Sequence, residues 1–150
     1  MTFSIAGFCR ETVQFGAATS SSSIYVASRC VFTDPKKGVV LTQNVTNPVF
    51  GQLEVQLLQE RLDPENVLAR LRDHEKCLEW RQLQVLDARG CNAVYSGAET
   101  LDVYATQPGD DCVAGGDMLA DEVVINTMVA AFKVQSGELA GRLLVAMEQA

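Results

Sequence analysis

The chain has 150 residues, of which 47% are hydrophobic and 21% are charged, and its 19 acidic and 12 basic side chains leave a net charge of −7. This length and composition are typical of a single globular domain, here residues 1–150, that buries a continuous core. The acidic balance, with no basic run longer than Lys36-Lys37, excludes the electrostatic footprint expected of a protein that binds DNA or RNA.

The N-terminus lacks the features of a targeting segment. No basic residues precede an apolar stretch, and Arg10-Glu11 interrupts the first apolar run after a few residues. We therefore expect neither a signal peptide nor a membrane span, and a cytoplasmic protein. The odd number of cysteines, none of them in a C-x-x-C pair, predicts free thiols rather than disulfides or a zinc site. The cysteines are Cys9, Cys30, Cys77, Cys91 and Cys112.

The first twenty residues predict a β-hairpin. Residues 3–8 form an apolar run, residues 10–12 are a polar break, and residues 13–18 form a second run whose small side chains allow close packing. A strand therefore begins almost at the first residue of the chain.

Thr2 is the first candidate for chemistry because of where it lies. Its small side chain is compatible with removal of Met1, which would leave a threonine that carries both a hydroxyl and a free α-amine. An α-amine that titrates near roughly 7.7 to 8.0 can accept the hydroxyl proton at neutral pH and activate the nucleophile. The alternative is an ordinary N-terminus in which the threonine has no chemical role.

The next part of the chain predicts a loop and two more strands. Four consecutive serines, residues 20–23, predict a loop, either a simple turn or the hydroxyl-lined rim of a pocket. Residues 24–32 are β-branched and aromatic and predict a strand. Residues 34–38 contain a proline and end in glycine, which is typical of a turn, and residues 39–41 continue as a strand.

Two helices are expected after the polar cluster of residues 42–48. The first begins near Pro48 and has helical spacing of its apolar residues, which are Phe50, Leu53, Val55, Leu57, Leu58 and Leu62. The second begins with Asp63 as N-cap and Pro64 at the first helical position, and it buries Val67, Leu68 and Leu71.

The second half repeats the order of strands followed by helices. Residues 83–87 and 91–95 flank a tight turn and predict a second hairpin. Residues 97–111 are mixed and polar, and residues 112–114 are a short apolar segment. Two amphipathic helices follow, one from Asp121 to near Gln135 and one that buries Leu139, Leu143, Leu144 and Met147. Such an order predicts sheets whose faces are covered by helix pairs.

Several segments together resemble a known family. The chain resembles the DUF1028 family of unknown function, whose fold is similar to that of the N-terminal-nucleophile (Ntn) hydrolases. The resemblance implies an α+β fold, a four-layer α-β-β-α sandwich, and by analogy an amide hydrolase with Thr2 as nucleophile and no cofactor. The matching segments are residues 1–5, 42–51, 81–83, 87–90, 96–99, 118–120, 137–140 and 142–144.

The chain departs from the family pattern at two places. Members usually carry Gln-Gly-Asn where this chain has Gly115-Gly116-Asp117. They also continue beyond the last helix into further strands, whereas this chain stops at Ala150. We therefore expect a sandwich that lacks those C-terminal strands.

Four further residues are candidates for a site around Thr2. Arg29 offers a fixed cation that could lower the pKa of the amine, and Gln43 and Asn47 offer amide donors for an oxyanion. Asp117 could orient an amine of the substrate. The alternatives are that Arg29 pairs with a surface carboxylate, that Asn47 caps the helix beginning at Pro48, and that Asp117 holds a turn.

The sequence thus predicts an Ntn-type amidohydrolase that acts on a small amide or peptide-like bond, with Thr2, Arg29, Gln43 and Asn47 as catalytic residues and no metal. The alternative is a non-catalytic binding or assembly module with the same sandwich. In either case we expect a homo-oligomer, because a small acidic domain that lacks strands would leave an apolar surface or a sheet edge uncovered.

Overall fold

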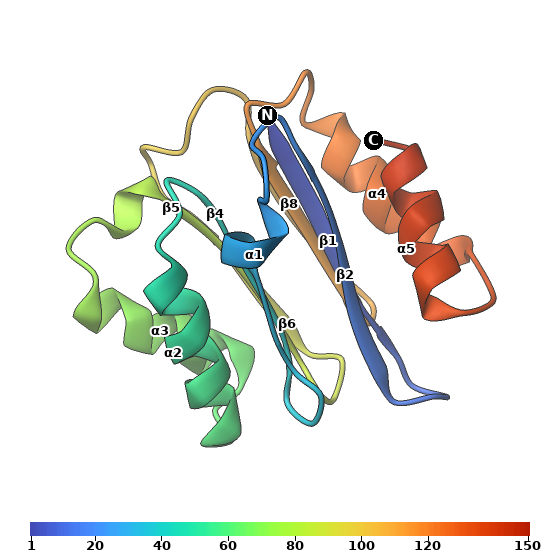
Figure 1. The fold of residues 1–150 in the computed structure, drawn as a ribbon, viewed down its shortest axis with the longest axis horizontal. Coiled ribbons are helices and arrows are strands. Elements are labelled where there is room, and N and C mark those ends of the chain that lie inside the picture. Colours follow the sequence, from blue (N-terminus) through green and yellow to red (C-terminus); the bar gives the residue numbers. More distant parts are fainter.

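The computed structural model describes residues 1–150 and is an α+β structure with two four-stranded antiparallel sheets and five α-helices (Figure 1). The first sheet has the order β2 (Gln14–Ser21), β1 (Thr2–Cys9), β8 (Cys112–Asp117), β7 (Ala105–Gly109). The second has the order β3 (Val31–Asp34), β4 (Gly38–Asn44), β5 (Arg81–Asp87), β6 (Asn92–Ser96). The helices are α1 (Ala27–Cys30), α2 (Pro48–Gln59), α3 (Pro64–His74), α4 (Val123–Val134) and α5 (Leu139–Glu148), with a 3₁₀ turn at Leu78–Trp80.

The first hairpin forms as predicted and fixes the position of Thr2. Its pairing runs from Cys9 opposite Gln14 near the turn to Thr2 opposite Ser21 at the open end. On its other side β1 pairs with β8, and Thr2 lies opposite Asp117 there. The expectation that a strand begins almost at the first residue is therefore confirmed, and this strand is internal to its sheet.

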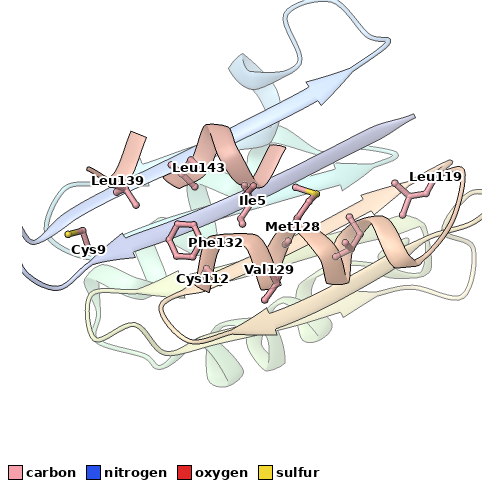
Figure 2. Close-up of a cluster of buried hydrophobic side chains, with 12 residues drawn as sticks. Ile5, Cys9, Cys112, Leu119, Met128, Val129, Phe132, Leu139 and Leu143 are labelled. Carbon is pink, nitrogen blue, oxygen red and sulfur yellow. The ribbon is translucent and has the colours of Figure 1, made fainter. Parts of the chain in front are cut away.

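Alternate residues of β1 point to opposite sides of the first sheet. Ile5 and Cys9 belong to a core formed with α4 and α5, whereas Ala6 and Phe8 belong to a core between the two sheets. Figure 2 shows the first of these cores, in which Phe132 of α4 lies over the strand. The α4–α5 pair therefore covers the outer face of the first sheet.

The second helix pair covers the outer face of the second sheet. Both helices begin as predicted, since the Asn47 side chain accepts from the Val49 N–H and the Asp63 side chain accepts from the Asn66 N–H. Their apolar residues, among them Phe50, Leu57, Leu58, Val67, Leu68 and Leu71, pack on Val40, Leu83 and Val85. The two sheets thus face each other, with one helix pair outside each of them.

The space between the sheets is apolar at one end and polar at the other. The apolar end contains Ala6, Phe8, Val39, Leu41, Leu86 and Val113. At the other end, the residues on these same inward strand faces are polar and almost completely buried. They are Ser4, Gln43, Gln82, Gln84 and Asp117. Gly115 allows this polar packing, because a Cβ at that position would lie 2.5 Å from the Gln84 Nε2 atom.

Two segments differ from the sequence-based prediction. Residues 24–30 do not form a strand: Ile24 and Tyr25 are 79% and 84% exposed, Tyr25 has a φ of 54°, and the chain turns into α1 before β3 begins at Val31. A strand is also present at β7, within a stretch that had shown no strand pattern. Its Pro108 is compatible with a strand because β7 is at the edge of its sheet.

All five cysteines are free; three are buried, and Cys77 and Cys91 are exposed. None of the helices combines the length and the apolar character that crossing a bilayer requires.

Candidate functional site

A pocket of about 300 Å³ opens at the polar end of the space between the sheets. It is lined by the N-terminal residue of β1, the C-terminal ends of β2, β4 and β8, and the segment that contains α1. Four of the five predicted site residues, Thr2, Arg29, Gln43 and Asp117, contribute to its wall. Residues separated by more than a hundred positions in sequence are therefore brought together at one end of the sandwich.

Thr2 lies in the middle of this arrangement. Because β1 lies between β2 and β8, Thr2 has Ser21 on one side and Asp117 on the other. The Thr2 and Ser21 hydroxyl oxygens are 2.9 Å apart, and Ser21 Oγ also accepts from the Ser23 N–H at 3.0 Å. These hydrogen bonds fix the Thr2 hydroxyl at the pocket wall.

Asp117 is the only acidic residue that lines the pocket, and it is 1% exposed. Its Oδ2 atom is buried without a hydrogen-bond partner. Burial raises the pKa of this carboxyl above its ordinary value, while the nearby N-terminal amine, the Asn44 backbone N–H and the Gln43 side chain act in the opposite direction. An unpartnered, buried carboxyl oxygen is an acceptor available to a ligand.

Gln43 lies deeper and connects the pocket to the polar interior. Its Nε2 atom is 3.4 Å from Gln82 Oε1 and 3.5 Å from the Gly115 carbonyl oxygen, so both contacts are long for hydrogen bonds. Its Oε1 atom is buried without a partner. The amide is thus held in place: its Oε1 atom is a free acceptor, and its Nε2 atom is a donor whose two present contacts are long.

Arg29 is the only basic side chain in the pocket wall. Its guanidinium donates from Nη1 to the Ile24 carbonyl oxygen at 3.1 Å and from Nη2 to the Ser23 hydroxyl. None of the four salt bridges in the structure involves Arg29. The alternative in which it pairs with a surface carboxylate is therefore not realised, and neutral oxygen atoms hold the guanidinium in place.

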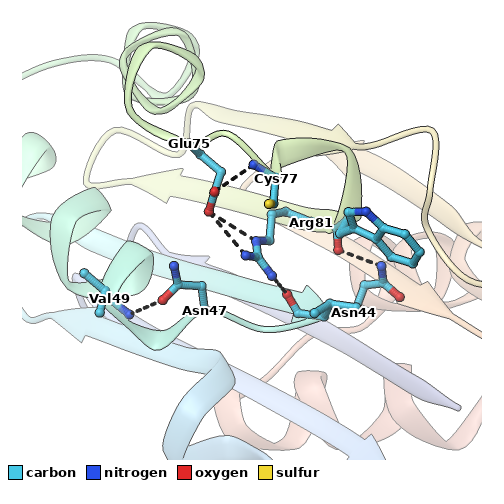
Figure 3. Close-up of polar contacts among 8 residues, drawn as sticks. Asn44, Asn47, Val49, Glu75, Cys77 and Arg81 are labelled. Atoms are coloured by element: carbon cyan, nitrogen blue, oxygen red, sulfur yellow. Dashed lines mark hydrogen bonds and ion pairs between the residues drawn. The ribbon is translucent and has the colours of Figure 1, made fainter.

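Asn47 lies outside the pocket wall. Figure 3 shows its side chain at the start of α2, where Oδ1 accepts from the Val49 N–H at 3.2 Å. The capping interpretation therefore describes it, and Asn44, at the end of β4, lines the pocket instead. Asn44 has a φ of 66°, and its side chain bonds to the Trp80 carbonyl at 2.7 Å and to the Leu101 N–H at 3.3 Å.

The N-terminal amine lies at the rim of the same pocket. With Met1 present, this amine is 3.5 Å from Ser22 Oγ and 3.9 Å from Met118 Sδ. The Thr2 nitrogen is then part of a peptide bond and cannot accept a proton. Removal of Met1 would place a free amine on Thr2 itself.

Ser21 is the pocket residue whose position next to Thr2 was not predicted. The signal for it was present in the sequence, because a hairpin that pairs Cys9 with Gln14 must pair Thr2 with Ser21. The serine run, however, predicts a loop from residue 20 onward. The structure shows that β2 continues through Ser20 and Ser21, so the rim hydroxyls begin on a strand.

A second, larger hollow does not share these features. It has a volume of about 640 Å³ between β2, the β3–β4 turn and α5, and eight of its 13 lining residues are hydrophobic. It contains none of the predicted site residues. We therefore place the candidate site in the smaller, polar pocket.

Fold and pocket together define an α+β protein in which two antiparallel sheets enclose a polar pocket at the start of an N-terminal strand. The chain belongs to the DUF1028 family: its residues 2–150 match the family described as "Family of unknown function (DUF1028)". The structure is similar to the crystal structure of a DUF1028 protein from Silicibacter pomeroyi, with a TM-score of 0.94 and 27% sequence identity. The similarity covers 99% of this chain and 69% of that protein. No curated protein matches the sequence.

Proposed function

We propose that this protein is an Ntn-type amidohydrolase in which Thr2, freed by removal of Met1, attacks a small amide or peptide-like bond. The observation that carries the proposal is the position of Thr2, whose hydroxyl lies at the wall of a pocket that also contains a cation, a buried carboxyl and amide groups. The likeness to Ntn hydrolases implied by the family resemblance supports it, and we infer that the helix–sheet–sheet–helix order is of that type.

The proposed reaction has two stages. In the first, the Thr2 hydroxyl oxygen forms a bond to the carbonyl carbon of the amide while its proton moves to the Thr2 α-amine. The carbon–nitrogen bond then breaks, and the leaving amine takes that proton. In the second, water attacks the resulting ester, so that the acid is released and the Thr2 hydroxyl is restored.

The surrounding groups have distinct roles in this proposal. Ser21 positions the Thr2 hydroxyl through the 2.9 Å hydrogen bond. Arg29 places a fixed positive charge in the wall of the same pocket. Gln43 donates from Nε2, whose present contacts are long, to the oxyanion, and such stabilisation is commonly worth several kcal/mol.

The test compares the untagged protein with three variants on a panel of small amides and dipeptides. Thr2→Ala should abolish turnover because it removes the nucleophile, whereas Thr2→Ser should retain part of it. Asn47→Asp keeps an N-cap outside the pocket and is the matched control, which should leave turnover unchanged. If turnover survives in Thr2→Ala, the hydrolase proposal fails and a binding or assembly module takes its place.

A further inference from the structure

The wall of the pocket carries one positive side chain, Arg29, and one negative side chain, Asp117. Arg29 of α1 donates to Ser23 and Ile24 in the segment after β2, and Asp117 ends β8, where it lies opposite Thr2. Strands in a sheet lie about 4.8 Å apart, so the side chains of β2 and β8 are separated by about 10 Å with β1 between them. A ligand that extends from Ser21 on β2 past Thr2 to Asp117 on β8 would therefore be about as long as a dipeptide.

The Arg29 guanidinium is suited to a carboxylate. Ser23 and Ile24 occupy only two of its five N–H donors, and its charge is not neutralised by any ion pair. A planar guanidinium binds carboxylates with paired, charge-assisted hydrogen bonds. Ser21 and Ser22 add hydroxyl groups on the same side of the pocket.

Asp117 is suited to an ammonium group. The carboxyl is 1% exposed and its Oδ2 atom has no partner, although it lines the pocket. A buried acceptor without a partner is costly, and a ligand that donates to it would remove that cost. The same carboxylate would repel a doubly charged phosphate more strongly than a singly charged carboxylate.

We propose that the pocket binds a zwitterionic substrate of dipeptide size, whose carboxylate contacts Arg29 and whose amino group contacts Asp117. The scissile carbonyl then lies between them, beside Thr2. The pocket volume of about 300 Å³ is at the small end of ligand sites, which limits the substrate to this size. This inference rests on the proposed function for the identity of the scissile bond, but the binding that it predicts can be measured separately.

The experiment measures binding rather than turnover. Thr2→Ala protein is titrated by calorimetry with L-alanyl-L-alanine, with its C-terminal amide, and with N-acetyl-L-alanine. We expect the free dipeptide to bind about tenfold or more tightly than either analogue, because each analogue loses one charge-assisted interaction. Arg29→Gln should bind the free dipeptide and its C-terminal amide equally well. Asp117→Asn should bind the free dipeptide and N-acetyl-L-alanine equally well.

Arg70→Gln, an exposed position on α3, is the matched control for the loss of a positive charge and should retain both preferences. Thermal unfolding of each variant verifies that it is folded, and Arg29→Lys should restore part of the preference for the carboxylate. Equal affinity for the dipeptide and its amide would overturn the proposal even if amide hydrolysis were observed. Conversely, the Met1-free protein could show both binding preferences and no turnover. That result would support the proposed ligand class and refute the proposed hydrolase function.

Discussion

Glu54 provides a prediction whose size follows from its environment. This residue of α2 is 0% exposed, and both of its carboxyl oxygens are buried without a hydrogen-bond partner. Burial alone raises its pKa well above the ordinary value. In the unfolded chain, where the glutamate pKa is about 4.3, the same carboxyl is easily ionised.

The sign of the pH dependence follows from these two pKa values. Below the unfolded pKa the carboxyl is protonated in both states and its ionisation does not affect stability. As the pH rises above about 4.3, the unfolded chain loses the proton while the folded protein keeps it, so stability falls by about 1.4 kcal/mol per pH unit. Stability stops falling once the pH exceeds the raised pKa that the Glu54 carboxyl has in the folded protein.

Two substitutions separate ionisation from burial. Glu54→Gln cannot ionise, so its stability relative to the wild type should increase by about 1.4 kcal/mol for each pH unit across that interval. Glu54→Met also removes the two unpartnered oxygens, and it should therefore be more stable than the wild type by about 1–3 kcal/mol even at acidic pH. Glu60→Gln, exposed just after the same helix, is the control and should follow the wild type.

The assay is urea unfolding at a series of pH values, followed by circular dichroism and by the fluorescence of Trp80, the only tryptophan. The difference between wild type and Glu54→Gln cancels the contributions of the other titrating groups. If this difference does not change with pH, Glu54 is solvated or paired in solution and the reasoning from its burial is wrong.

Three other predictions concern packing, thiols and assembly. A Cβ added at Gly97 would overlap the backbone carbonyl of Glu79, so Gly97→Ala should lower the free energy of unfolding by about 1–3 kcal/mol. Gly141 lies in α5 with open space around it, so Gly141→Ala should raise the free energy of unfolding by about 0.5–1 kcal/mol. Equal effects of the two substitutions in thermal or urea unfolding would contradict this packing. With a thiol reagent, native protein should show two fast sites, Cys77 and Cys91, and denatured, non-reduced protein should show five; fewer than five would indicate a disulfide. The homo-oligomer stays a prediction, for which light scattering should give a dimer mass, and a monomer at micromolar concentrations would refute it.

Local patterns were sufficient to predict most of the fold. The first hairpin, both helix starts and the second hairpin follow from periodicity, turn residues and caps, and each is confirmed. Residues 24–30 could not be predicted in this way because Ile24 and Tyr25 are apolar but exposed, and a hydrophobic pattern assigns such residues to a buried strand. Edge strand β7 was missed because Pro108 and Gly109 are usually strand breakers.

The site was predictable only as far as single residues could be placed at strand ends. Thr2, Gln43 and Asp117 lie at or near such ends, and the structure brings them into one pocket with Arg29. Asn47 was predicted to be in the site and Asn44 was not, because both lie in one polar segment and only the start of α2 determines which side chain serves as its cap. The partner of Thr2 across the sheet depended on where β2 ends, which the serine run concealed.

The central claim, that Thr2 is an N-terminal nucleophile, is tested most directly by intact-mass and peptide-mapping mass spectrometry of the untagged protein after treatment with a β-lactone electrophile. We predict a chain that lacks Met1 and carries a single adduct on Thr2, which is absent in Thr2→Ala. A chain that retains Met1, or an adduct that persists in Thr2→Ala, would contradict the claim.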